Sequence, residues 1–407
     1  MSLSRHFYDL DEVHAALQYC STRNDQHETV FWSYELLRSG CVAETISTLF
    51  EAWLWNKGPF CLSWISVAQR LASDEVTEED ILLASYQLSW VPHTQRDHSL
   101  WNILVLTAEG TECERITLKT PPYLPSNDKH ELYMFRAMFQ GKAYNAWWMS
   151  RHLSNERVWE LLRWYVIHNC PMYADQYLSY FTILKKYESL LGYRSDEYDV
   201  IIRCLAVLSV CLNGEQQEKS WHTLPSIMEP RLQTAICEWD VECGRKQHRR
   251  YSIPNACLYG RCRRGRMKWS ESTVPYLGAL EKGFIGCPFW EEAVTEYQLN
   301  DTWRSDDARE AFYDRYLVDD VPDEWTKAEK QKSHGDGLLG PTQTNRLAVY
   351  SRRFGMARLL WNAGPIVQAF LEKKEGCDPL DVVRWFPPPG EITPILLRPV
   401  HRRLVYL

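Results

Sequence analysis

Two stretches of this chain, residues 28–53 and 142–166, carry aromatic-rich apolar residues at helical spacing. The first apolar face consists of Val30, Phe31, Tyr34 and Leu37. Gly40 follows that face, at a place where a left-handed residue closes a helix. Two antiparallel helices with a short connection are the unit of helical solenoids, because one pair cannot bury its apolar face alone. The feature predicts an all-α protein of stacked antiparallel helix hairpins, arranged as a solenoid or as an irregular helical array.

The second stretch is weakly similar to the first. Ser154, a residue type that caps helices, separates two faces. The first consists of Ala143, Ala146, Trp147 and Ser150, and the second of Val158, Leu161, Leu162 and Tyr165. Two interpretations remain open: a true internal repeat, or chance similarity between two amphipathic hairpins.

Polar residues mark the expected helix ends. Asp25 with Glu28, and Thr77 with Asp80, have the three-residue spacing of a capping box. Pro171 suits the first position of a further helix. These signals predict helices that begin after residues 25, 77 and 154, and one that begins at Pro171.

Changes in composition divide the chain into four regions. The spacing of turn residues and charges predicts a helical array at 1–245 with an irregular loop at 110–130, a basic insertion containing Gly and Pro at 246–300, an acidic segment with a mobile loop and a last helix at 301–385, and an extended proline-rich arm at 386–407.

Tryptophan is unusually frequent, with 18 residues among 407. Most of those in the first part of the chain lie at helical spacing beside Leu or Val, which favours a bulky aromatic core over an exposed aromatic surface. The net charge of −7 is ordinary for a soluble protein. No secretory signal and no membrane span is expected, so the 13 cysteines should be reduced.

The strongest local signal is a basic segment at 245–268 that contains no acid. It comprises Arg245, Lys246, Arg249, Arg250, Arg261, Arg263, Arg264, Arg266 and Lys268. Aromatic residues interleave with these charges, as in surfaces that bind phosphates and unpaired bases. The alternative is an acidic protein surface, within this chain at the acidic run 306–324 or on another molecule. Nucleic acid and protein therefore remain open as partners.

No pattern for a metal, a cofactor or catalysis is convincing. Cys237, Cys243, His248, Cys257, Cys262 and Cys287 cluster in sequence, but their spacing fits a zinc site poorly. The GxGxxG match at 335–340 lacks the strand and helix that a dinucleotide site needs. Histidines such as His14, His152 and His168 fall in expected helices, where structural roles are common. The chain is therefore predicted to have no cofactor, no metal site and no catalytic residue.

The C-terminal region is expected to be extended and to dock on a neighbour. Five prolines between Pro387 and Pro399 favour an extended backbone. Apolar residues along it provide anchors: Trp385, Phe386, Ile395, Leu397 and Leu404. Such an arm predicts at least one protein partner, while the oligomeric state stays open.

Three stretches carry a resemblance to a known family. These are FYDLDEVHAALQYC with VFWSYELLRSG, AWWMSRHL, and YSIPNACLYGRCRRGRMKW with IGCPFWEEAVTEY. They resemble uncharacterised proteins of large nucleocytoplasmic DNA viruses that infect algae and amoebae, over about residues 6–300. The resemblance implies a place in the host cytoplasm or in the virus particle. It implies no active-site residue.

The expected function is therefore that of a non-enzymatic structural or assembly protein, a minor virion component. A nucleic-acid-binding protein using residues 245–268 is the first alternative, and an enzyme of unrecognised type is the second. The segment 251–290 should form an ordered insertion packed on the helices rather than a flexible loop. Its expected anchors are Ile253, Leu258, Met267, Trp269, Phe284 and Phe289.

Overall fold

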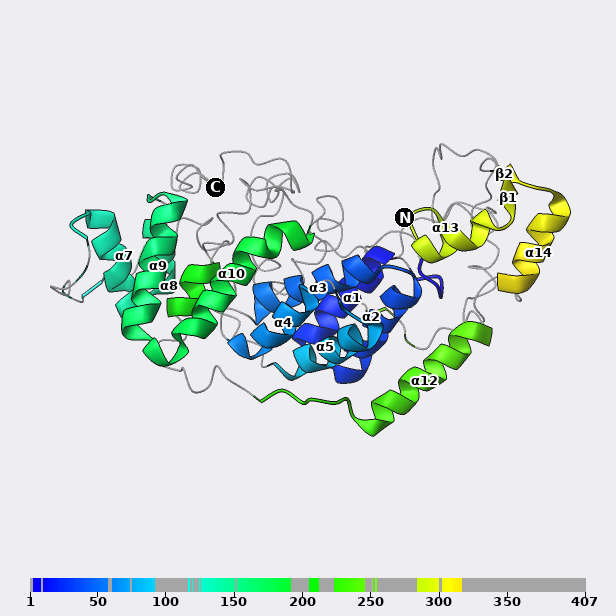
Figure 1. Cartoon of the computed structure of the whole chain (residues 1–407), viewed down its shortest axis with the longest axis horizontal. Helices are drawn as coiled ribbons and strands as arrows, with labels where there is room; N and C mark the ends of the chain where they lie inside the picture. The colour runs from blue at the N-terminus through cyan, green and yellow to red at the C-terminus, as the bar shows by residue number, and fades with distance from the viewer. Residues whose placement is uncertain are drawn as a thin grey trace, which may run out of the picture. The chain divides into compact units, whose positions relative to one another are not determined.

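The computed structural model confirms an all-α architecture (Figure 1). It describes residues 3–8, 10–57, 61–73, 75–91, 116–117, 119, 124, 126–150, 152–191, 205–211, 223–245, 251, 253–254, 284–299 and 302–316. The α-helices are α1 (Leu10–Thr22), α2 (Gln26–Arg38), α3 (Val42–Asn56), α4 (Ile65–Leu71), α5 (Glu78–Trp90), α7 (Lys129–Phe139), α8 (Ala143–Ser150), α9 (Asn155–Asn169), α10 (Ala174–Leu191), α12 (Pro230–Arg245), α13 (Pro288–Thr295) and α14 (Asp306–Tyr316).

Short elements complete the described structure. Two 3₁₀ turns, Leu62–Trp64 and Pro171–Tyr173, lead into α4 and α10. The strands β1 (Gln298–Leu299) and β2 (Thr302–Trp303) form a small antiparallel pair, with Gln298 opposite Trp303. This pair spans position 300, where the sequence predicts a change from basic insertion to acidic segment.

The helices belong to two compact units. The first unit draws on Met1–Leu49, Thr77–Ser89 and Pro225–Arg353, and the second on Phe50–Val76 and Trp90–Leu224 together with the C-terminal residues. The predicted helical array at 1–245 therefore contributes to both units. A sequence pattern reports neighbours along a helix, whereas the units follow from contacts between distant segments.

Helix starts follow the predicted caps. Asp25 Oδ1 accepts from the Glu28 backbone N–H at 3.0 Å, and Ser154 caps α9 in the same way. Thr77 and Asp80 form a reciprocal capping box, each accepting from the backbone of the other at 3.2 Å. The Glu28 half of the first box differs from expectation. Its carboxylate accepts from the Trp32 indole N–H at 3.1 Å, because a buried indole needs an acceptor.

The closest helix pairs are α1 with α2 and α7 with α8. Figure 1 shows α1 and α2 side by side. The predicted stretches 28–53 and 142–166 do form helices, α2 with α3 and α8 with α9, but the most extensive packing is displaced by one helix. Pairing depends on which faces meet in three dimensions, and α2 offers no preferred face, since it is buried from Thr29 to Leu37.

Matching turns follow α2 and α7. Gly40 N–H donates to Leu37 O, and Cys41 N–H donates to Leu36 O, which together form a Schellman motif. The motif recurs at Gly141, where Gly141 and Lys142 donate to Met138 and Ala137. Both glycines have positive φ, 79° and 65°. The ends of α2 and α7 therefore share the same turn geometry.

Gly40→Ala should destabilise the protein more than Gly141→Ala. Both changes force a side chain into a left-handed conformation, at about 1–2 kcal/mol. At Gly40, however, the new Cβ would lie 2.8 Å from Pro288 Cβ, whereas at Gly141 the nearest atom is 3.5 Å away. Urea denaturation of the two variants measures the difference. Equal losses would show that the contact with Pro288 relaxes without cost.

The first unit has an aromatic core around α2. Phe31 packs edge-on against Trp32 and Trp239 at 4.9 and 5.3 Å between ring centroids. Trp239 comes from α12, whose Asp240 accepts from Arg38 at 2.9 Å and from Tyr34 Oη at 3.3 Å. These contacts hold α12 against α2.

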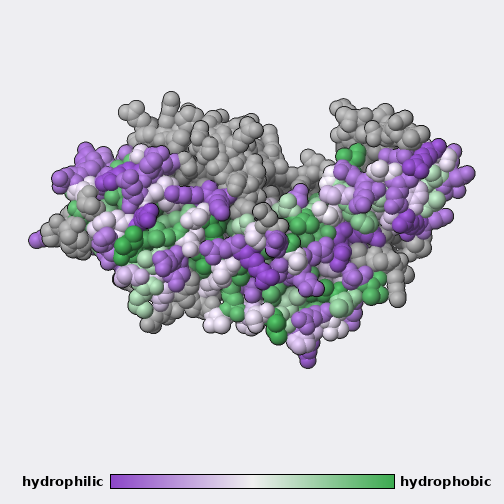
Figure 2. Space-filling view, in the orientation of Figure 1, coloured by the Kyte–Doolittle hydropathy of each residue, from purple (hydrophilic) through white to green (hydrophobic). Residues whose placement is uncertain are grey.

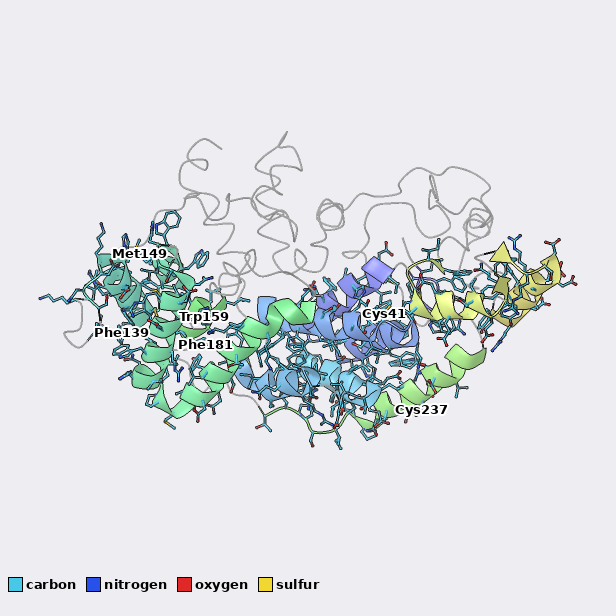
Figure 3. All side chains as sticks on the ribbon, turned by 45° about the horizontal axis from the view of Figure 1, so that its top comes forward. Cys41, Phe139, Met149, Trp159, Phe181 and Cys237 are labelled. Carbon is cyan, nitrogen blue, oxygen red and sulfur yellow. The ribbon has the colours of Figure 1, made fainter. Side chains whose placement is uncertain are left out.

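The second unit also has an aromatic core. Trp53 packs on Trp64 at 5.4 Å and on Tyr180 at 5.6 Å. Tyr177 and Tyr180 of α10 are buried in this core. Figure 3 shows Trp159 of α9 beside Phe181 of α10, with ring centroids 5.5 Å apart.

Four tryptophans in the first part of the chain confirm the predicted aromatic core, since Trp32, Trp53, Trp64 and Trp147 are fully buried. Trp148, Trp159 and Trp164 are half-buried, and Trp90 is 44% exposed. Side-chain packing of Trp55 and Trp101 lies outside the described residues. Large rings fill the gaps between short helices.

Residues 284–287 form a turn that leads into α13. Gly286 has φ 82°, and Pro288 occupies the first position of α13. Beyond the β pair, α14 buries Phe312 and exposes Asp306, Asp307, Glu310 and Asp314. Figure 2 shows a mainly hydrophilic surface over this part of the first unit. The rest of the acidic run lies outside the described residues.

Candidate functional site

Most residues of the predicted contact surfaces lie outside the described residues. Arg245 is the last residue of α12. Beyond the described ranges fall Lys246, Arg249, Arg250, Arg261, Arg263, Arg264, Arg266 and Lys268 of the basic segment, and Trp385, Phe386, Ile395, Leu397 and Leu404 of the arm. The GxGxxG match also falls there. The described residues nevertheless define both flanks of residues 255–283, a stretch that carries the basic residues from Arg261 to Lys268.

The first flank rests on the N-terminal segment Ser4–Tyr8. The Tyr8 hydroxyl donates to the backbone carbonyl of Tyr251. The Tyr251 ring packs edge-on against Phe31 at 4.8 Å. Two residues further on, Ile253 is buried, as expected for an anchor.

The second flank reaches the same N-terminal segment. Trp290 is fully buried and donates its indole N–H to Ser4 O at 2.9 Å. Phe284 stacks on Trp290 with centroids 4.6 Å apart. The Arg5 guanidinium lies over the Phe289 ring at 4.4 Å. Because Ser4 and Tyr8 are close in sequence, Tyr251 and Trp290 both contact the same short N-terminal segment.

A buried ion pair holds the N-terminal segment to α2. His6 Nδ1 lies 2.5 Å from Glu35 Oε2, and the His6 backbone N–H donates to Glu35 Oε1 at 2.9 Å. Burial by itself raises the pKa of Glu35. The charge and hydrogen bonds of His6, with a hydrogen bond from Ser4, outweigh burial, so the pKa lies below its ordinary value. Glu35 is therefore a carboxylate inside the core.

Ser39 extends this network. Its Oγ accepts from the Arg5 backbone N–H at 2.9 Å and donates to Glu35 O at 2.7 Å. Its carbonyl accepts from the Phe289 N–H at 3.1 Å. The network thus joins the N-terminal segment, the end of α2 and the start of α13.

Two thiols border the network but are not prepared for nucleophilic attack. Burial raises the pKa of both Cys41 and Cys287 to about 12. A thiol with such a pKa carries very little thiolate near neutral pH, and the thiolate is the nucleophile. Cysteine, histidine and glutamate therefore lie together here without the activation that catalysis by a cysteine requires.

Lys57 is a second buried charged residue that the sequence did not single out. It lies after α3 in the second unit, and burial lowers the pKa of its amine to about 7. An amine with this pKa is partly neutral at physiological pH and can act as a nucleophile when a substrate reaches it. Its side chain is fully buried. No local pattern distinguishes Lys57 from an exposed lysine at a helix end.

Two of the predicted structural histidines lie within hydrogen-bonding distance of an oxygen atom. His14 Nδ1 lies 2.8 Å from Thr48 Oγ1, and His168 Nδ1 lies 2.8 Å from Trp164 O. Of the loose cysteine cluster, Cys237 is exposed and Cys287 is buried. Within the described ranges, no group of three His, Cys, Asp or Glu residues is arranged to hold a metal ion.

Comparison with protein-family models, with curated proteins and with solved structures finds no match to this chain. Among the helices that the structure describes, none combines the length and the apolar character that crossing a bilayer requires. The geometry of the described residues therefore provides the basis for a functional proposal.

Proposed function

We propose that the protein is a non-enzymatic structural or assembly protein that works through protein–protein contacts. The observation that carries the proposal is the anchoring of the chain on both sides of residues 255–283, which carry five of the nine basic residues. Tyr251 on one side and Trp290 on the other hydrogen-bond to the buried segment Ser4–Tyr8. A chain segment that is held at both ends loses less conformational entropy when it binds a partner.

The charge of the basic segment favours an acidic partner. The segment contains nine basic residues and no acidic one, so its charge is complementary to that of an acidic protein surface. The apolar C-terminal arm adds a second contact that needs no core of its own. The resemblance to proteins of large DNA viruses favours a minor virion component, present in the host cytoplasm or in the particle.

Deleting residues 386–407 should leave the helical units folded and weaken association. The measurement compares full-length and truncated chains, both expressed in infected host cells, for co-sedimentation with virus particles and for thermal unfolding. The full chain should sediment with particles and the truncated chain should not. Loss of the cooperative melt on truncation would show that the arm belongs to the core, and equal sedimentation would contradict a docking role.

Nucleic-acid binding is a second candidate function. Tyr259 and Trp269 interleave with the basic residues, and such aromatics stack on unpaired bases. If this function holds, the logarithm of the affinity for labelled single-stranded DNA or RNA falls steeply with the logarithm of salt concentration, because phosphate contacts release counterions.

The arginines of the segment provide the discriminating variant. Replacing Arg261, Arg263, Arg264 and Arg266 with alanine should reduce nucleic-acid affinity and flatten its salt dependence. Arg163→Ala, at an exposed position of α9, is the control and should change neither. Binding that is undetectable even at low salt, or unchanged in the fourfold variant, would leave protein contact as the function.

A further inference from the structure

The turn after α2 packs against the start of α13. Phe289 N–H donates to Ser39 O at 3.1 Å. A Cβ on Gly40 would lie 2.8 Å from Pro288 Cβ. Because Ser39 contacts Phe289 and Gly40 contacts Pro288, the two segments run antiparallel, and Cys41 and Cys287 are the next residues in this order.

The two thiols converge on one acceptor. Cys287 Sγ lies 3.5 Å from Ser39 O, and Cys41 Sγ lies 3.8 Å from the same oxygen. The separation of the two sulfur atoms therefore cannot exceed the sum of these distances. Both cysteines are buried and in the free thiol form. Figure 3 shows Cys41 at the turn, beside the first residues of α13.

We infer that Cys41 and Cys287 are the site of a reversible disulfide that forms when the protein meets a peroxide. One thiolate attacks the peroxide, so an S–O bond forms, the O–O bond breaks and water leaves after protonation. The second thiol then attacks the sulfenic sulfur, so the S–S bond forms and a second water leaves. Two thiols are oxidised and one hydrogen peroxide is reduced to two waters.

Burial sets the rate of this reaction. A thiol must open to solvent and ionise before it attacks, and both thiols are buried with pKa values raised to about 12. The disulfide between Cys41 and Cys287 therefore forms slowly, unlike that of a rapid redox sensor. Once formed, the bond ties the end of α2 to the start of α13. It thereby fixes the second flank of the basic segment, whatever partner that segment binds.

The test uses the full-length protein, reduced and then treated with hydrogen peroxide at low protein concentration. Peptide mapping by mass spectrometry without reductant should find Cys41 linked to Cys287. The oxidised protein should melt several degrees higher, because the crosslink closes a long loop and restricts the unfolded chain. Reductant should reverse both changes.

Matched variants separate this bond from other thiol chemistry. Cys41→Ser and Cys287→Ser should each abolish the rise in melting temperature, with alanine replacements as a second choice if a serine variant fails to fold. Cys237→Ser, at the exposed cysteine of α12 in Figure 3, should retain it. Unlinked Cys41 and Cys287 after oxidation, linkage of either to another cysteine, or a linked protein without a higher melting temperature would overturn the inference.

Discussion

Replacing Trp290 with alanine should cost about 3–5 kcal/mol of unfolding free energy, the range for removing a large buried aromatic ring. Trp290 is fully buried, and its ring contacts Phe7, Phe284 and Phe289 with centroid distances of 4.6 to 5.4 Å. The change also leaves Ser4 O without its indole donor. Urea denaturation, followed by hydrogen exchange of peptides from α1 and α2, measures the loss in the unit concerned.

Two further variants show how much of the lost unfolding free energy comes from packing and how much from the hydrogen bond. Trp90→Ala is the matched control, since Trp90 is 44% exposed and should lose much less. Trp290→Phe retains most of the packing and removes the hydrogen bond, so it should lose about 1–3 kcal/mol. Equal stability of Trp290→Ala and the native protein would mean that the second flank is not anchored to the N-terminal segment.

His6→Ala should have a comparably large effect, about 3–5 kcal/mol, because it leaves the buried Glu35 carboxylate without its charged partner. Glu35 and His6 are both buried, so solvent screens the pair little. The double variant His6→Ala/Glu35→Gln should regain part of the loss, since it removes the uncompensated charge. His168→Ala, at an exposed position on α9, provides the control.

The stability of the native protein and that of His6→Ala should respond to acid in opposite directions through Glu35. In the native protein the pKa of Glu35 lies below its ordinary value of 4.5, so the carboxylate stabilises the fold above that value. This contribution is lost as the pH falls through the folded-state pKa. In His6→Ala, burial raises the pKa of Glu35, and the folded state then prefers the protonated acid.

The deficit of His6→Ala relative to the native protein should therefore shrink between about pH 7 and about pH 5, because Glu35 of the folded variant takes up a proton while Glu35 of the native protein stays ionised. Urea denaturation at each pH measures both curves. A deficit that is constant with pH would show that His6 acts through packing and not through its charge.

Local signals gave the helices and many of their ends. The caps at Asp25, Thr77 and Ser154 form as predicted, because each depends on atoms within three residues. The turn at Gly40 follows for the same reason, since only the backbone conformation of one residue decides it. The buried tryptophans were likewise visible as large apolar residues at helical spacing.

Only the tertiary structure revealed the role of the first residues. The sequence presents His6 as an isolated polar residue near the start of the chain and Glu35 as a charge on a helix. Packing brings them together inside the core. Charged residues are rarely buried unless they are paired, and the partner here is 29 positions away, beyond any local periodicity.

Helix pairing and the contact between Cys41 and Cys287 also depend on residues that are far apart in sequence. Helix periodicity fixes which residues share a face, but not which helix covers it, so the pairing of α1 with α2 came from the structure. The opposition of Cys41 and Cys287 likewise depends on two distant backbones in register. The sequence by itself determined an all-α chain with capped, aromatic-rich helices. Contacts between residues far apart along the chain decided its two units, its buried ion pair and the anchored base of its basic segment, because long-range packing has no counterpart in local spacing.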